Sequence, residues 1–187
     1  MGTNYREAIL DAAKKAAQAH GYSGLNFRDL AAGVGIKSAS IHYHFPTKAD
    51  LGAAVAKRYW EDSAACLDGL LETLGDPLAC LRAYPNTFRR SLESENRMCL
   101  CSYMAAEYDD LPDAVKAEVQ AFTDVNVAWL GKLLVAAGQA SAADSEGRAR
   151  AIYAAVVGAQ LLARSRADLA LYDSLIDNYR AAGLLPA

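Results

Sequence analysis

A short stretch of the chain, residues 37–44, gathers side chains that can contact nucleic acid. Its hydroxyl, phenol and imidazole groups offer donors and acceptors for base edges, and its lysine offers a positive charge for phosphates. An alanine among them is small enough to permit close approach or contact with a thymine methyl group. Taken singly, each residue would be interpreted as a solvated polar group or a core residue, but together they suggest a recognition surface. The candidate contacts are Lys37, Ser38, Ala39, Ser40, His42, Tyr43 and His44.

Two further basic residues flank this stretch and can add phosphate contacts. Lys48 is expected in the first turn of a helix, where free backbone N–H groups already favour an anion. Arg28 is expected on the preceding helix, from which it could reach a phosphate or a guanine. Ile41 and Phe45 lie among the polar residues and are predicted to form the packing side of the same short helix.

The sequence contains no complete set of metal ligands and none of the common catalytic motifs considered below. His42 and His44 resemble a metal-binding pair, but no carboxylate or thiol at ligand spacing completes the set. The motifs G-x-x-x-x-G-K, H-E-x-x-H and G-x-S-x-G do not occur, and all three histidines precede residue 45, far in sequence from the cysteines. We therefore predict no catalytic residue, no metal and no cofactor, and an enzyme on a helical scaffold is the least favoured alternative.

The composition indicates a globular, all-α protein with a substantial core. Of the 187 residues, 53% are hydrophobic, 22% are charged and 39 are alanine, which favours helices over strands. The apolar stretch 151–163 is too short to cross a bilayer, and the first residues show no secretory signal pattern. A cytoplasmic location without membrane contact is therefore expected, with the four cysteines as reduced thiols.

Charge is distributed unevenly along the chain. Residues 1–60 contain eight basic and four acidic residues, a net charge of +4, whereas the remaining residues carry −7 within the total of −3. A basic N-terminal segment on an acidic body suggests a polyanionic partner at one end only.

Capping residues, glycines and hydrophobic spacing predict about nine helices. Asn26 and Thr47 are typical residues at helix starts, and Gly21 and Gly35 are typical of helix ends. Pro85 predicts a kink or an early end within the fifth segment. The expected helices span about residues 3–20, 27–34, 38–45, 47–74, 77–92, 99–108, 113–137 and 141–166, and a last one begins near residue 169.

The second and third predicted helices, joined by a tight turn at Gly35, have the arrangement of a helix-turn-helix. The segments REAILDAA, GYSGLNFRDLAAGVGIKSASIHYHF and PTKADL resemble the N-terminal DNA-binding region of the TetR family of transcriptional repressors, without a gap over roughly residues 6–55. Two residues depart from the family pattern. His42 stands where a tyrosine contact to phosphate is usual, and Lys37 stands where a small hydroxyl cap is usual.

The resemblance implies both an architecture and a function. Residues 1–48 would form the helix-turn-helix DNA-binding domain, and residues 49–187 a helical domain for ligand binding and dimerisation. A homodimer is expected because paired recognition helices about 34 Å apart read a two-fold DNA site. The chain would repress transcription by binding double-stranded operator DNA, and a small-molecule inducer or modification of a sensor cysteine would release it.

The resemblance also implies that the last two helices form the dimer interface. Small residues recur there at helical spacing, which permits close helix approach. Packing within one chain is the alternative explanation for each of them. The candidate interface residues are Ala151, Ala155, Gly158, Ala159, Leu162, Ile176 and Tyr179.

Large side chains on the middle helices could line a ligand pocket, since such pockets are mostly apolar with a few polar groups. Ordinary core packing is again the alternative for each. The candidate pocket residues are Trp60, Phe88, Tyr103, Phe122 and Asn126.

Cys99 is the candidate sensor. The stretch NRMCLCSYMAAEYDDLP resembles a NemR-like subgroup of the family, in which a cysteine followed by leucine senses electrophiles or oxidants. A helix N-terminus and the neighbouring Arg97 would lower the pKa of this thiol. The alternative is a small buried hydrophobic residue, and Arg164 stands where the subgroup can carry a lysine.

One further function belongs to a different class. The unusual His42 and the acidic body are also compatible with a helical ligand-binding or interaction module that does not bind DNA. Salt-sensitive, sequence-selective DNA binding would separate the two hypotheses.

Overall fold

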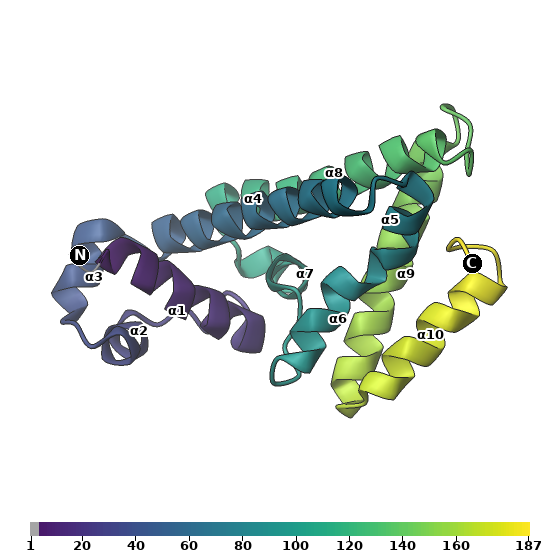
Figure 1. The fold of residues 1–187 in the computed structure, drawn as a ribbon. Helices are drawn as coiled ribbons and strands as arrows, with labels where there is room; N and C mark the ends of the chain where they lie inside the picture. Colours follow the sequence, from purple (N-terminus) through teal and green to yellow (C-terminus); the bar gives the residue numbers. More distant parts are fainter. Residues whose placement is uncertain (1–3) are drawn as a thin grey trace. The chain divides into compact units, whose positions relative to one another are not determined.

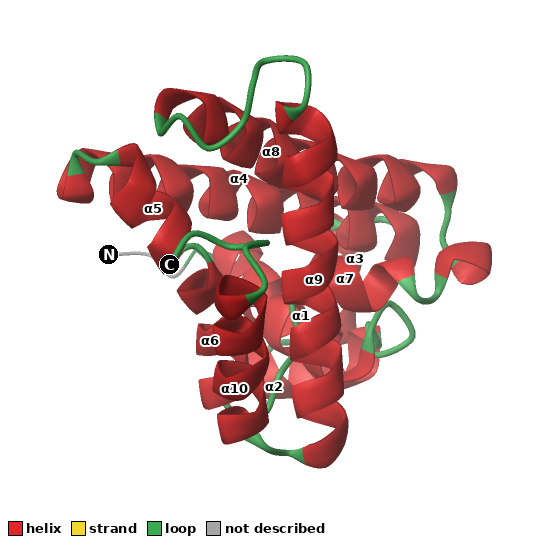
Figure 2. Cartoon of the chain, turned by 90° about the vertical axis from the view of Figure 1, so that its right-hand side faces the viewer, coloured by secondary structure: helices red, strands yellow, loops and turns green. Residues whose placement is uncertain are grey.

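The computed structural model describes residues 4–187, and every regular element in that range is a helix (Figures 1 and 2). The all-α fold class predicted from the sequence is therefore confirmed. The elements are α1 (Tyr5–His20), α2 (Phe27–Val34), α3 (Ser38–His44), α4 (Lys48–Leu74), α5 (Pro77–Ala83), α6 (Pro85–Glu93), α7 (Leu100–Ala105), the short 3₁₀ helix η1 (Tyr108–Asp110), α8 (Asp113–Ala136), α9 (Ser145–Arg166) and α10 (Leu169–Ala181).

Within residues 4–187, the nine predicted helical segments correspond to ten α-helices because the fifth is divided at Pro85. Tyr84 keeps helical dihedral angles, with φ −50° and ψ −45°, so the chain passes directly from α5 into α6. Proline is tolerated at the first position of a helix, where its missing N–H would have no partner. The start predicted near Thr3 lies outside the described residues, and the described part of the first helix begins at Tyr5.

Side-chain caps fix several of the helix starts. The Asn26 side chain accepts hydrogen bonds from the N–H groups of Arg28 and Asp29 at the start of α2. Asp76 and Asp168 accept equivalent bonds at the starts of α5 and α10. These bonds satisfy backbone donors that have no partner inside the helix.

The chain forms two compact units. Unit 1 contains Met1–Glu61 and Cys99–Phe122, and unit 2 contains Asp62–Met98 and Thr123–Ala187. One boundary falls just before α7 and the other two fall inside α4 and α8, so each of these two long helices contributes one part to each unit.

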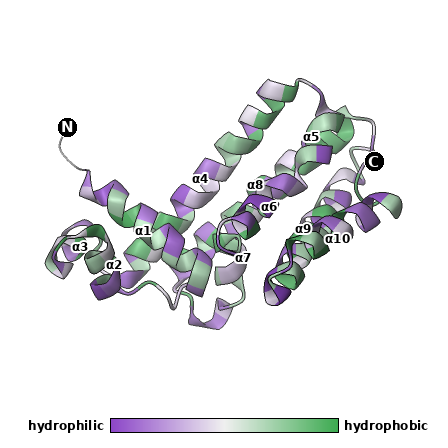
Figure 3. Cartoon of the chain, turned by 60° about the horizontal axis from the view of Figure 1, so that its bottom comes forward, coloured by the Kyte–Doolittle hydropathy of each residue, from purple (hydrophilic) through white to green (hydrophobic). Residues whose placement is uncertain are grey.

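In unit 1, α1 lies against α2, α3 and α7. Its inward residues Ile9, Leu10 and Ala13 are almost fully buried. Leu51 and Val55, in the first turns of α4, are buried as well. Figure 3 shows hydrophilic and hydrophobic residues alternating along α1 and α4, as expected for helices with one buried side.

In unit 2, α9 and α10 run side by side (Figures 1 and 2), and α6 contacts both of them. Tyr172 of α10 is buried and its hydroxyl donates to the Pro85 carbonyl oxygen at 2.7 Å. The Gln160 side-chain amide of α9 donates to the Phe88 carbonyl oxygen, also at 2.7 Å. These buried polar contacts fix the three helices relative to one another because each donor would otherwise be unsatisfied.

None of the helices within residues 4–187 combines the length and the apolar character that crossing a bilayer requires.

Candidate nucleic-acid interface

The turn between α2 and α3 is built around one glycine. Gly35 has φ 76° and ψ 33°, a left-handed conformation that glycine adopts without a steric penalty. Its N–H donates to carbonyl oxygens in the last turn of α2, and the Ile36 N–H donates to the Ala31 oxygen at 3.0 Å. These bonds close α2, so that α3 begins only three residues later at Ser38.

One side of α3 is buried in unit 1. Ile41 is fully buried, and Phe45, directly after the helix, is 3% exposed. Leu30 and Ala31 of α2 are buried as well, and α3 contacts both α1 and α2. The prediction that Ile41 and Phe45 form the packing side is confirmed.

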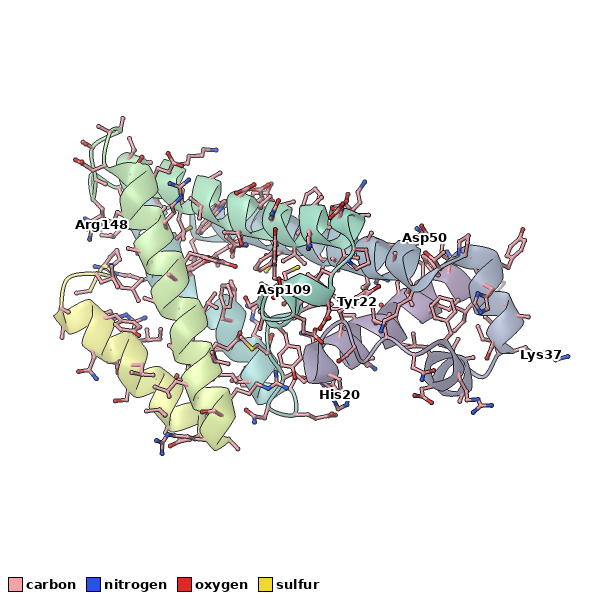
Figure 4. All side chains as sticks on the ribbon, turned by 180° about the vertical axis from the view of Figure 1, so that it is seen from behind. His20, Tyr22, Lys37, Asp50, Asp109 and Arg148 are labelled. Atoms are coloured by element: carbon pink, nitrogen blue, oxygen red, sulfur yellow. The ribbon has the colours of Figure 1, made fainter. Side chains whose placement is uncertain are left out.

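The opposite side of α3 faces away from the protein. Tyr43 is 82% exposed, and Figure 4 shows Lys37 extending away from the ribbon. A group of basic, small, hydroxyl-bearing and aromatic side chains therefore lies wholly or partly on the surface. Its exposed members are Lys37, Ser38, Ala39, His42 and Tyr43, and its half-buried members are Ser40 and His44.

His42 is oriented by two contacts. Its ring lies 4.7 Å from the Phe27 ring, measured between centroids, and its Nδ1 lies 3.3 Å from the Pro46 carbonyl oxygen. A hydrogen bond to that oxygen requires the proton on Nδ1. Nε2 is then the ring nitrogen left for a phosphate or a base.

Lys48 is held against the turn that follows α1. Its Nζ donates to the Ser23 carbonyl oxygen at 3.4 Å and lies 4.5 Å from the centre of the Tyr22 ring. The helix start predicted at Thr47 is confirmed, and it is fixed by a capping box, in which Thr47 N–H donates to Asp50 Oδ2 at 2.9 Å and Asp50 N–H donates to Thr47 Oγ1 at 3.1 Å. Figure 4 marks Asp50 in this turn.

Part of the basic charge of the N-terminal segment is used inside unit 1. Arg58 forms ion pairs with Glu7 at 3.0 Å and with Asp11 at 2.7 Å. Arg28 and Lys37, by contrast, are exposed on α2 and before α3. These two residues therefore present exposed positive charge to a polyanion on α2 and at the start of α3.

One contact that supports this interface was not predicted from the sequence. It joins Glu107 to the turn that follows α1. The Glu107 carboxylate accepts hydrogen bonds from the N–H groups of Tyr22 at 2.5 Å and Ser23 at 3.2 Å. Gly21 signalled a turn, but nothing in the sequence identified a partner more than eighty residues away.

Cys99 lies at the N-terminus of α7, as predicted, but it is 1% exposed. The prediction of a lowered thiol pKa is wrong, because burial raises the pKa of Cys99, and hydrogen bonds involving Ser102 and Tyr59 offset only part of that effect. Arg97 forms an ion pair with Glu95. In a site so well shielded from water, the neutral thiol is favoured over the thiolate.

The five predicted pocket residues are divided between the two units. In unit 2, Asn126 Oδ1 accepts a hydrogen bond from the Tyr84 hydroxyl at 2.9 Å, and the Phe88 ring lies 5.7 Å from the Tyr84 ring. In unit 1, Trp60 Nε1 donates to Glu118 Oε2 at 2.7 Å. Phe122, also in unit 1, is buried with its ring 5.5 Å from that of Tyr59, and Tyr103 is half-buried.

Unit 2 also contains a hollow of about 360 Å³ between α8 and α9. Its walls combine small apolar residues with both signs of charge, and none of the five predicted pocket residues lines it. The lining residues are Thr123, Asp124, Val127, Ala128, Gly131, Lys132, Ser145, Glu146 and Arg150.

The predicted interface residues of α9 and α10 fall into two groups. Ala151, Gly158 and Leu162 are exposed, and Ala155 and Tyr179 are half-buried. Ala159 and Ile176 require a correction, because they are 1% and 4% exposed within the single chain. They pack inside unit 2 and offer almost no surface to a second chain.

The comparisons with known proteins agree with this geometry. Residues 9–55 match the family model described as bacterial regulatory proteins of the tetR family. No curated protein matches the chain. This family match contains both helices of the helix-turn-helix and the first turns of α4.

Solved structures extend the match to the whole chain. A TetR transcriptional regulator from Legionella pneumophila is 30% identical, with a TM-score of 0.90 over 97% of this chain and 99% of that chain. A TetR family regulator from Agrobacterium tumefaciens is 28% identical, with a TM-score of 0.87 over 95% and 96% of the two chains. The reduced form of NemR from E. coli shares the fold, with a TM-score of 0.83 at 18% identity over 98% of each chain. The chain therefore belongs to the TetR family of DNA-binding transcriptional regulators.

Proposed function

We propose that the protein is a homodimeric repressor whose two α3 helices bind successive major grooves of a two-fold operator. The division of α3 into a buried side with Ile41 and an exposed side with Tyr43 carries this proposal. A helix this short reads only a few base pairs, so specificity requires a second copy about 34 Å away. Such a regulator acts on DNA in the cytoplasm.

Within this proposal, residues 1–48 bind DNA, and residues 49–187 bind the effector and the second chain. The base contacts are assigned to Ser38, Ala39, Ser40, Tyr43 and His44. The phosphate contacts are assigned to Arg28, Lys37, His42 and Lys48. Lys48 would have to exchange its contacts with Ser23 and Tyr22 for a phosphate, so its contribution is expected to be smaller than that of Lys37.

The dimer surface is assigned to the exposed side of α9 and the adjoining residue Tyr179. Leu161 and Leu162 are 55% and 45% exposed, which is unusual for large apolar side chains. Ala151 and Gly158, on the same exposed side, are small enough to let a second helix approach closely. Burial of this side against its copy would remove the leucines from water.

For release from DNA, the structure favours a non-covalent effector over modification of Cys99. A buried thiol with a raised pKa carries little thiolate at neutral pH, and the thiolate is the reactive form. Thermal shifts with a panel of small molecules, repeated with Cys99→Ser, test this choice. An aldehyde or quinone that releases DNA from the wild type but not from the Ser variant would restore the covalent mechanism.

DNA binding itself is tested by selecting duplexes from a random-sequence pool with the purified protein. Tyr43→Ala is expected to weaken binding to the selected duplex by about tenfold or more, since base contacts contribute about 1–3 kcal/mol each. Tyr108→Ala, which removes another exposed tyrosine of unit 1, is the matched control. If no sequence is enriched at low salt, the chain is an interaction module and the proposal fails.

A further inference from the structure

The Glu107 carboxylate holds the turn that connects α1 to α2, here called the 21–23 turn (residues 21–23). Oε2 accepts a hydrogen bond from the Tyr22 N–H at 2.5 Å, and Oε1 accepts one from the Ser23 N–H at 3.2 Å. Both bonds involve an ionised acceptor, which makes them stronger than bonds between neutral groups. Figure 4 shows Tyr22 beside the segment that carries Asp109, two residues after Glu107.

The carboxylate fits closely because residue 21 has no side chain. Gly21 has φ 67°, and a Cβ added to it would lie 2.0 Å from Glu107 Oε2. Any other residue at this position would therefore collide with the carboxylate as well as strain the backbone. The turn and Glu107 form one matched contact.

The 21–23 turn is connected directly to the DNA-binding helices. The Leu25 N–H donates to the Tyr22 carbonyl oxygen at 3.1 Å, and Asn26, the next residue, caps α2. Lys48, in the first turn of α4, donates to the Ser23 carbonyl oxygen at 3.4 Å. A displacement of the turn would therefore reach the start of α2 and the start of α4.

Glu107 is also connected to the buried start of α7. The helix is a single short segment, Leu100–Ala105, whose Leu100 and Met104 are fully buried in unit 1. At its N-terminus, the Cys99 side chain is hydrogen-bonded to that of Tyr59 in α4. At its C-terminal side, the Glu107 N–H donates to the Met104 carbonyl oxygen at 2.9 Å.

We propose that Glu107 is the positioning residue through which a displacement of α7 alters DNA binding. It contacts no DNA itself, but it fixes the turn that sets where α2 begins. A helix of fewer than two turns moves as a unit, so repacking at Cys99 shifts Glu107 and, through the two N–H bonds, the helix-turn-helix. This inference rests on the proposed DNA-binding function but not on any particular effector.

The first experiment compares Glu107→Gln with Asp109→Asn, which makes the same charge change at an exposed position of the same segment. Glutamine can accept only one of the two hydrogen bonds because its NH₂ group would face an N–H donor. We expect faster amide exchange at Tyr22 and Ser23 and about tenfold weaker binding to the selected duplex in Glu107→Gln. Asp109→Asn should alter neither, and equal behaviour of the two variants would overturn the proposal.

A second experiment separates transmission from a merely structural role. Cys99→Met enlarges the side chain at the start of α7, and Cys99→Ala reduces it if the larger variant does not fold. Either change is expected to alter the dissociation constant for the selected duplex by at least about threefold in the wild type, and to have no further effect in Glu107→Gln. An equal change in both backgrounds, or none in the wild type, would contradict transmission through Glu107.

The two proposals fail in different ways. If the protein selects no duplex, DNA binding is wrong, and the Glu107 contact is still tested by amide exchange at Tyr22 and Ser23 in the Cys99 variants. If a duplex is selected but the exchange rates do not respond to the Cys99 variants, DNA binding stands and transmission through Glu107 is wrong.

Discussion

The Arg89 guanidinium of α6 binds the Asp173 carboxylate of α10 through two parallel hydrogen bonds, Nε to Oδ1 at 2.7 Å and an Nη2 bond to Oδ2 at 2.9 Å. The hydrogen bond from Arg89 lowers the pKa of Asp173. Since the carboxylate is more acidic in the folded state, the pair stabilises the fold above the pKa of an unfolded aspartate, and this contribution is lost as the pH falls through the folded pKa.

Asp173→Asn should therefore lower the free energy of unfolding at pH 7 by about 1 kcal/mol or less, because both side chains remain partly exposed to solvent. The difference from the wild type should shrink as the pH is lowered below about 4. Urea unfolding at several pH values measures this, with Asp177→Asn as the control for an exposed ion pair within one helix. If the difference in the free energy of unfolding between the wild type and Asp173→Asn grows as the pH falls, the ionised Asp173 does not stabilise the fold through Arg89.

Gly21 and Gly35 provide a matched pair of glycine substitutions. Both have positive φ, but an added Cβ meets open space at Gly35 and the Glu107 carboxylate at Gly21. Gly35→Ala is expected to cost about 1–2 kcal/mol from backbone strain alone. Gly21→Ala should cost about 2–4 kcal/mol because the hydrogen bonds of Glu107 are also disturbed.

The excess cost of Gly21→Ala should fall when Glu107→Ala is already present, since the carboxylate no longer occupies the space beside residue 21. Some excess is expected to remain because the Tyr103 ring edge lies 2.6 Å from the added Cβ. Thermal or urea unfolding of the wild type, Gly21→Ala, Glu107→Ala and the double variant measures the coupling energy between the two positions. If the two single losses in the free energy of unfolding simply add in the double variant, the contact between residues 21 and 107 does not form.

Lys37→Ala should reduce the salt dependence of DNA binding. Each neutralised phosphate contributes about −0.9 to the slope of log K against log salt concentration, so the slope should become shallower by about 1. Lys132→Ala, an exposed lysine of α8 in unit 2, is the control and should leave the slope unchanged. Anisotropy titrations of a labelled duplex at several salt concentrations provide the comparison.

Leu162→Glu should dissociate the proposed dimer. The substitution places a charge on the exposed side of α9, where burial against a second chain would leave it unpaired. Leu74→Glu is the control, because Leu74 is a similarly exposed leucine, at 42%, and lies at the end of α4, outside the proposed interface. Sedimentation velocity should show a monomer only for Leu162→Glu, and a dimer in both variants would place the interface elsewhere.

The cysteines should react with N-ethylmaleimide at very different rates. Cys66 is exposed, whereas burial raises the pKa of Cys80, Cys99 and Cys101. At neutral pH, Cys66 should be labelled first and the other three should react only slowly or after unfolding. Peptide mass spectrometry identifies the labelled sites, and rapid native labelling of Cys99 would show that α7 opens readily.

Local signals in the sequence were sufficient to predict the helices. Caps such as Asn26 and stops such as Gly35 act within a few residues, so most helix boundaries could be located without knowledge of the tertiary structure. The exceptions are α9, which was predicted from residue 141 but begins at Ser145, and α7, which was predicted to extend to residue 108 but ends at Ala105. The packing of Ile41 and Phe45 was also predictable, because a short amphipathic helix has only one apolar side.

Whether a particular residue is buried depends on elements distant in sequence. The predictions of which residues are exposed were therefore less accurate than the predictions of the helices. The helix start at Cys99 was predicted correctly, yet the packing of α7 in unit 1 reverses the expected direction of its pKa shift. Ala159 and Ile176 have the spacing of an interface but fill the core of unit 2. The Glu107 contact was missed because a single glutamate carries no sequence signal for two backbone N–H groups in another element.

The sequence of the selected duplex, and the number of chains bound to it, show whether the exposed sides of two α3 helices recognise DNA as a pair. We expect an inverted repeat whose half-site centres lie about 34 Å, or a multiple of that distance, apart. Each repeat should bind an even number of chains, and Tyr43→Ala should abolish this binding. A single asymmetric site bound by one chain, or binding that Tyr43→Ala leaves unchanged, would contradict recognition by paired α3 helices.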